Sequence, residues 1–227
     1  MTARCLALAL IACWSSVSQA QVPPTAPDKA AYTGLFAAAA QGDAAQVKAL
    51  AAKGAKVDAK DGHGRTPLHV AAYGSKHDAM RALVASGANP NALENDRYDI
   101  VTIAAVANDI STLKVALELG CGPKNITSRY DGTALIAAAH LGHADVVRTL
   151  IRAGAPLDHV NNLGWTAVIE AIVLGDGGLR HIDTLRALIQ AGANLNLADR
   201  QGQTPLALAQ TRRYQTMADM LKQAGAR

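Results

Sequence analysis

The sequence predicts an all-α fold, a stack of about six helix-turn-helix units joined by short β-hairpin loops. Two markers recur in phase along the chain, and the residues between them are polar and rich in Gly, Asn and Asp. A glycine followed by a small residue recurs at spacings of 33, 33, 34, 38 and 33, at Gly54, Gly87, Gly120, Gly154, Gly192 and Gly225. A capping residue keeps the same period, at Thr33, Thr66, Asp99, Thr133, Thr166 and Thr204. A fixed period of this length indicates a repeat solenoid.

The fourth unit shows how one period becomes two helices. Thr133 is placed to cap a first helix of small apolar residues that ends before Gly142. The second helix, over 143–154, carries an apolar stripe of valine, leucine and isoleucine that faces its neighbours. Gly154 ends it because glycine adopts the left-handed conformation without strain. The polar residues that follow predict a projecting hairpin loop.

The second unit carries the most specific motif. Its run Asp61-Gly-His-Gly-Arg-Thr-Pro-Leu-His-Val-Ala-Ala72 resembles the ankyrin repeat family, whose period is 33 and whose signature includes Thr-Pro-Leu-His-x-Ala. The resemblance covers 31–227 and implies a solenoid that binds proteins without catalysis. The expected units are 31–60 (N-terminal cap), 61–94, 95–127, 128–160, 161–198 with about five extra residues, and 199–227 (C-terminal cap).

The first twenty residues are predicted to be a signal peptide. A short basic start precedes an apolar run too short to span a bilayer, and Ser18-Gln-Ala20 suits signal peptidase. Residues 21–30 then read as a Pro-rich linker, and the domain is expected in the periplasm or secreted. In one alternative, Leu10-Ile-Ala-Cys13 is a lipobox and a lipidated Cys13 anchors the protein to the membrane. In another, this segment is a buried N-terminal helix.

Composition and motifs argue against several other functions. A net charge of +4 without a Lys/Arg block gives no nucleic-acid footprint, and the phosphate-binding, nucleophile-elbow and metalloprotease motifs are absent. Thr66 and His69 are interpreted as hydrogen-bonding partners that hold the repeat together, because other units replace the histidine. His140 and His143 have a spacing that zinc can use but lack a third ligand, and Cys121 occupies a small-residue packing slot. We therefore expect no cofactor and no metal; a small His- or Cys-dependent enzyme is the alternative.

The resemblance implies that a partner protein binds hairpin tips and the exposed side of the first helices, which line a concave groove. Of the seven aromatic residues in 21–227, four fall at these hairpin and first-helix positions, with arginines between them. Tyr, Trp and Arg are the residue types most often found at interface hot spots. The expected partner-binding residues are Arg65, Tyr73, Tyr98, Arg129, Tyr130, His140, Leu163, Trp165 and Arg200. We expect a monomer with Trp165 and Tyr130 as anchors; a secreted effector that engages a host protein is an alternative setting.

Overall fold

The computed structural model describes residues 21–227, and the predicted signal peptide and Cys13 lie outside this part of the chain. Thirteen helices and no extended strand occur within it. The helices are α1 (Ala26–Ala31), α2 (Gly34–Gln41), α3 (Ala44–Ala52), α4 (Pro67–Tyr73), α5 (His77–Ala85), α6 (Ile100–Val106), α7 (Ile110–Glu118), α8 (Ala134–His140), α9 (Ala144–Arg152), α10 (Ala167–Val173), α11 (Leu179–Gln190), α12 (Pro205–Thr211) and α13 (Gln215–Gln223). The predicted all-α solenoid is confirmed.

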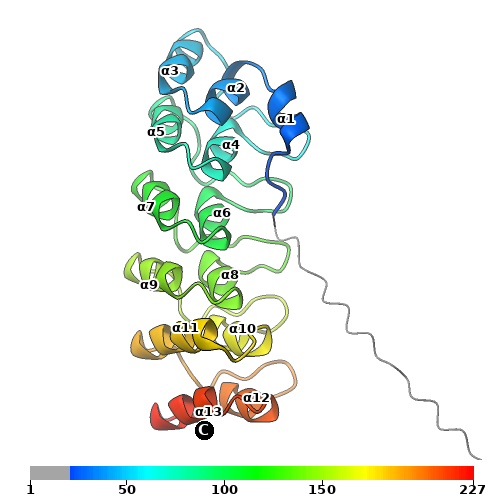
Figure 1. The fold of residues 1–227 in the computed structure, drawn as a ribbon, viewed down its shortest axis with the longest axis vertical. Coiled ribbons are helices and arrows are strands. Elements are labelled where there is room, and N and C mark those ends of the chain that lie inside the picture. The colour runs from blue at the N-terminus through cyan, green and yellow to red at the C-terminus, as the bar shows by residue number, and fades with distance from the viewer. Residues whose placement is uncertain (1–20) are drawn as a thin grey trace, which may run out of the picture.

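The helices form two columns along one axis (Figure 1). The first helix of each unit, from α2 to α12, stands in one column, and the second, from α3 to α13, stands beside it. The hairpin loops project from the side of the first helices. We call the side where the first helices meet these loops the inner face. Alanine at 0% exposure, such as Ala71 and Ala138, lets neighbouring first helices pack closely.

Local capping explains the helix starts. The hydroxyls of Thr133 and Thr166 each accept a hydrogen bond from the backbone N–H three residues later, both at 3.3 Å. In the third unit, where threonine is replaced, the Asp99 carboxylate accepts from Thr102 N at 2.8 Å. The loops are tight turns rather than ladders, and the described residues contain a single isolated bridge, between Thr127 and Gly132.

His69 connects two units, as the sequence predicts. Its Nδ1 lies 2.8 Å from Thr66 Oγ1 and accepts from Thr66 N at 3.1 Å. Its Nε2 lies 3.0 Å from the Ala92 carbonyl and 3.2 Å from the Tyr98 carbonyl. These distances fit a ring protonated at Nε2 that joins the start of α4 to the hairpin of the third unit. The structural role of Thr66 and His69 is confirmed.

Residues 21–31, predicted mostly as a linker, instead pack on the inner face; we call them the N-terminal segment. Its α1 begins at Ala26 and is capped by Thr25, which forms a capping box with Asp28. The residues before α1 run along the first-helix column beside the hairpin loops (Figure 1). Gln21 Nε2 donates to the carbonyls of Thr102 and Ile103, both at 3.2 Å, and Pro24 is buried. The prolines of this segment suggested a linker. Its polar contacts join residues far apart in sequence, so no local sequence pattern predicts them.

The extra residues of the fifth unit lengthen the turn before α11 and its first helical turn. His181, which is buried in α11, has Nδ1 2.9 Å from Asp176 Oδ1 and Nε2 2.9 Å from the His140 carbonyl. From the other side, the Tyr214 hydroxyl donates to the Gly175 carbonyl at 3.0 Å. The insertion is therefore fixed to both neighbouring units. Across residues 21–227, the helices are all too short or too polar to cross a bilayer.

Candidate protein-binding site

Each hairpin is held by a side chain at the same place in its unit. Asp61 Oδ1 accepts from Arg65 N at 2.9 Å, and Asn161 Oδ1 accepts from Trp165 N at 3.0 Å. Arg65 and Trp165 both immediately precede the capping threonine. They therefore occupy equivalent slots, at the base of the hairpin, in the second and fifth units.

Arg65 is buried, which corrects the prediction that it faces a partner. Its side chain is 1% exposed; Nε donates to Asp61 Oδ2 at 2.7 Å, and one terminal nitrogen donates to Asp28 Oδ2 at 3.1 Å. The other donates to the Val22 carbonyl at 3.1 Å. Because Val22 and Asp28 belong to the N-terminal segment, the arginine binds this chain's own residues. Thr25 N–H and then Arg65 lower the pKa of Asp28 to about 2.

The aromatic side chains of the second and third units are also covered. Tyr98 is buried, contrary to the prediction, and Tyr73 is half-buried with a buried hydroxyl that lacks a hydrogen-bond partner among the described residues. Burial raises the pKa of both phenols. The inner face of these two units therefore offers little of its predicted binding surface to solvent.

The remaining predicted residues are exposed or partly exposed to solvent. Tyr130 is 45% exposed, Leu163 is exposed, and Trp165 and His140 are partly exposed. Arg129 and Arg200 are exposed as well, but each contacts the preceding hairpin: Arg129 pairs with Asp96, and Arg200 donates to the Asn162 carbonyl. Both arginines thus also connect neighbouring hairpin tips.

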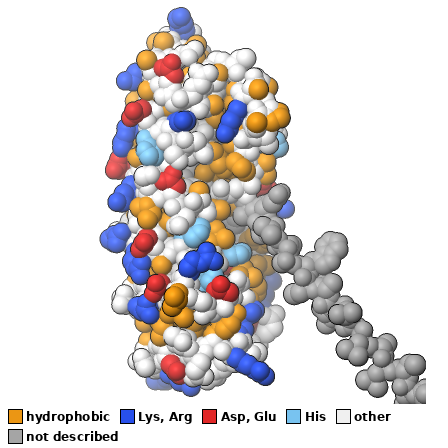
Figure 2. Space-filling model, in the orientation of Figure 1, with side chains coloured by type: hydrophobic (Ala, Val, Ile, Leu, Met, Phe, Trp, Pro, Cys, Tyr) orange, Lys and Arg blue, Asp and Glu red, His pale blue; other side chains and the backbone are white. Residues whose placement is uncertain are grey.

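Exposed apolar surface is concentrated in the fourth and fifth units. All the exposed large hydrophobic residues of the described chain fall between residues 126 and 179: Ile126, Tyr130, Val160, Leu163, Leu174 and Leu179. The first four belong to two successive hairpins, and the other two flank the insertion. Figure 2 shows hydrophobic, histidine and charged side chains gathered at the level of α8 to α11. We call the surface formed by Tyr130, His140, Leu163, Trp165, Glu170 and Leu174 the unit four–five face.

Glu170 was not among the predicted residues, although it is the one charged residue in α10. Its Oε1 accepts from Asn161 Nδ2 at 2.9 Å, and its Oε2 lies 3.4 Å from His140 Nδ1. Burial raises the pKa of Glu170 to about 7, opposed by the Asn161 hydrogen bond. Burial, and then His181, lower the pKa of His140. A lone acid within an apolar run is the sequence signal that could have identified this residue.

The three residues of the enzyme alternative, His140, His143 and Cys121, each contact different parts of the fold. His143 Nδ1 lies 3.1 Å from the Ala105 carbonyl, whereas His140 faces Glu170. Cys121 is 1% exposed, and burial raises the pKa of its thiol, which disfavours the nucleophilic thiolate. Residues 21–227 contain no group of three or more potential ligands suited to a metal ion.

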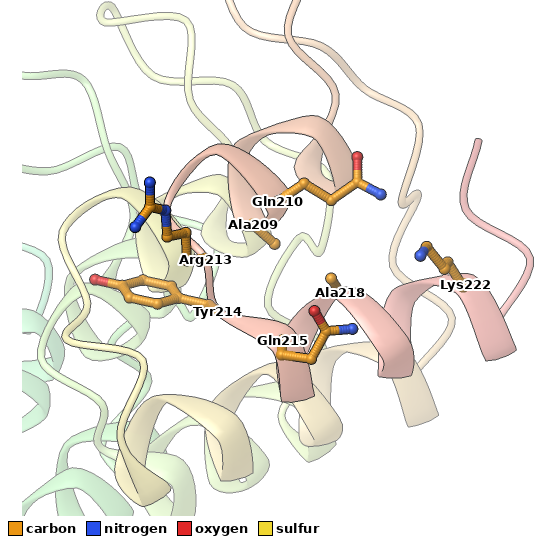
Figure 3. Close-up of a pocket in the computed structure, with 7 residues that line it drawn as sticks. All are labelled: Ala209, Gln210, Arg213, Tyr214, Gln215, Ala218 and Lys222. Carbon is orange, nitrogen blue, oxygen red and sulfur yellow. The ribbon is translucent and has the colours of Figure 1, made fainter.

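A shallow depression of about 180 Å³ lies away from this face, between α12 and α13. Ala209, Arg213, Tyr214 and Lys222 are among its lining residues, and Figure 3 shows the Tyr214 ring pointing away from Lys222. This depression is on the last unit, at the end of the stack, whereas the exposed apolar residues lie one to two units before it.

The stacked helix pairs and the inner face define a class of helical repeat proteins, and sequence similarity identifies the family within that class. A model of ankyrin repeats (3 copies) matches residues 7–94 and 101–199. The ankyrin repeat protein YahD of Escherichia coli is 31% identical over 194 residues, covering 83% of this chain and 94% of YahD. The chain therefore belongs to the ankyrin repeat family.

Solved structures agree. An ankyrin repeat domain from Acinetobacter baumannii is 42% identical, with a TM-score of 0.79, over 85% of this chain and 98% of that domain. A chain in the complex of a Bdellovibrio bacteriovorus predatory endopeptidase with an immunity protein is 26% identical, with a TM-score of 0.69, over 85% and 98%. Ankyrin repeat proteins generally mediate protein–protein interactions.

Proposed function

We propose that this chain is a non-catalytic protein-binding module that works in the cell envelope and holds its partner on the unit four–five face. The observation that carries the proposal is the distribution of apolar surface: every exposed large hydrophobic residue of the described chain lies between residues 126 and 179. A concentration of exposed apolar side chains in one part of a fold is a feature of interaction sites, and Tyr130, Leu163 and Leu174 of this set belong to the unit four–five face.

The chemistry of the face suits a protein partner. Tyr130 and Trp165 offer rigid aromatic area at successive hairpins, and aromatic anchors carry a large share of interface energy. Hydrogen bonds between loops, such as Asn162 N to the Tyr130 carbonyl at 2.9 Å, hold the two hairpins in register. Little ordering is therefore needed when a partner binds.

The Bdellovibrio complex supports this proposal, because a chain of the same architecture occurs in an assembly of an endopeptidase with an immunity protein. The proposed setting rests on the leader-like first twenty residues. Localisation separates the alternatives. Mature chain in the periplasm or membrane fraction supports an envelope role, whereas chain found only in the culture supernatant supports a secreted effector; membrane retention that depends on Cys13 indicates lipidation.

The test is a crosslinking pull-down from native envelope with the wild type and the Tyr130→Ala/Trp165→Ala double variant. We expect the double variant to fold normally and to lose the partner. The matched control, Arg81→Ala/Glu118→Ala, removes an exposed ion pair between α5 and α7 and should retain the partner. Equal recovery by both double variants would contradict the proposed face.

The enzyme alternative has a separate test. Metal analysis of the purified protein and thiol titration of Cys121 should find no stoichiometric metal and a slowly reacting thiol. A bound metal ion or a fast-reacting thiol would support catalysis instead.

A further inference from the structure

Glu170 has an unsatisfied carboxylate oxygen in the middle of the unit four–five face. The side chain is 5% exposed, and Asn161 satisfies only Oε1. Oε2 is buried and has no hydrogen-bond partner among the described residues. Leaving a buried charged acceptor unpaired is costly, and such groups concentrate at functional sites.

The His140 imidazole lies next to this oxygen. Its Nδ1 is 3.4 Å from Oε2, without hydrogen-bond alignment, and its side chain is 37% exposed. Within residues 21–227 the imidazole makes no hydrogen bond; only the backbone carbonyl of His140 is held, by His181. Rotation of the imidazole toward solvent would therefore break no hydrogen bond and would remove its contact with Oε2.

In the second unit, a guanidinium satisfies the carboxylate at the base of the hairpin. Asp61 occupies the slot equivalent to Asn161, and its Oδ2 accepts from the Arg65 guanidinium at 2.7 Å and from the Tyr32 hydroxyl at 2.8 Å. In the fifth unit, Trp165 takes the arginine's slot, and the nearby Arg200 donates to the Asn162 carbonyl rather than to Glu170. A planar guanidinium can bind the carboxylate and stack on an indole at the same time.

We propose that the partner inserts an arginine side chain beside Trp165, displaces the His140 imidazole and binds the Glu170 carboxylate. This inference rests on the proposed function and specifies the chemistry of the partner at that same face. It gives the unsatisfied Oε2 its donor, and it gives a role to the one charged residue of the otherwise apolar α10.

The test uses residues 21–227, which contain all thirteen described helices, and a displayed library of random heptapeptides. Peptides that bind the wild type, Glu170→Gln and Trp165→Ala are selected in three separate experiments. Glutamine has nearly the same shape as glutamate but no charge, so it isolates the carboxylate. We expect arginine to be enriched in the wild-type pool and to lose that enrichment in the Glu170→Gln pool.

The best arginine peptide is then titrated with Trp165 fluorescence as the signal, since Trp165 is the single tryptophan of residues 21–227. Citrulline keeps the shape of arginine without its charge. The change to citrulline should weaken binding about 10- to 100-fold on the wild type and by less than threefold on Glu170→Gln. His140→Ala should bind the arginine peptide at least as tightly as the wild type.

The outcomes separate the two proposals. Equal arginine enrichment in the wild-type and Glu170→Gln pools overturns the arginine inference, and so does a citrulline peptide that binds as tightly as its arginine parent. If arginine is not required but Trp165→Ala no longer selects the peptides that bind the wild type, the arginine inference is wrong and the proposed unit four–five face is supported. A wild-type protein that selects no peptide, or pools unaffected by Trp165→Ala, counts against the proposed function.

Discussion

Glu170→Gln should stabilise the protein at neutral and alkaline pH. The glutamine carbonyl can still accept from Asn161, and its amide group offers a hydrogen-bond donor to His140 Nδ1. What the substitution removes is the burial of a charge. Its effect on stability should therefore follow the ionisation of Glu170 and depend on pH.

The magnitude follows from the raised pKa. Glu170 titrates at about 7 in the folded protein, against its ordinary value of 4.5. Between these values the folded state binds more protons than the unfolded state, so the wild type loses stability as pH rises from 4.5 to 7. At about 1.4 kcal/mol for each pKa unit, the loss is about 3 kcal/mol. The advantage of glutamine should grow from near zero at pH 4 to about 3 kcal/mol at pH 8.

The assay is urea unfolding of both proteins at several pH values, followed by Trp165 fluorescence. The pKa values of His140 and Asp176 are also lowered near this site, but both residues are present in both proteins and their contributions largely cancel in the difference. A destabilised Glu170→Gln, or a difference that does not change with pH, would refute the reasoning. A destabilised Glu170→Gln would mean that Glu170 is ionised and paired with a protonated His140, leaving no unsatisfied oxygen for a partner. A difference that does not change with pH would mean that folding leaves the pKa of Glu170 unchanged.

Three further predictions concern the scaffold. Arg65→Ala should lower the free energy of unfolding by about 2–3 kcal/mol, because it leaves the carboxylates of Asp28 and Asp61 without their cation. An unchanged free energy in urea unfolding would contradict this role of the buried Arg65. His69→Ala should lower the free energy of unfolding by about 2–3 kcal/mol, since it breaks hydrogen bonds to both Thr66 and the next hairpin. Amide exchange should become faster around α4 and Tyr98, and unchanged exchange there would argue against this role. Cys121 should react with a disulfide reagent at pH 8 only as fast as the protein opens, and immediate labelling of the native chain would show that the thiol is accessible.

The repeat register could be predicted from sequence because its signals are local. Thr133 caps a helix through a bond to a residue three positions away, and Gly154 ends one with a positive φ of 85° that a Cβ would strain. Neither depends on a distant contact. The identity of each unit, and the slots that its side chains occupy, follow directly.

The fate of individual slots could not be predicted in the same way. Arg65 was expected at the surface, but it binds Asp28, 37 residues earlier, in a segment whose prolines suggested a linker. Glu170 stands where an apolar core residue is expected, and its neighbours Asn161 and His140 come from a hairpin and another helix. Slot assignment identifies which side chains point to the inner face; contacts between elements decide whether they are exposed.

The N-terminal segment also affects how the stack unfolds. In a linear repeat array each unit is stabilised mainly by its nearest neighbours, and the end units open first. Here α1 precedes the first unit, Asp28 and Val22 bind Arg65 in the second, and Gln21 binds α6 in the third. The segment therefore couples units that are not neighbours, and the first three should open as one cooperative block. A ligand that displaced residues 21–24 would lower the cooperativity of unfolding along the chain. Binding at one end of the array would then change the stability of a unit two positions away without any change in the units' own structure.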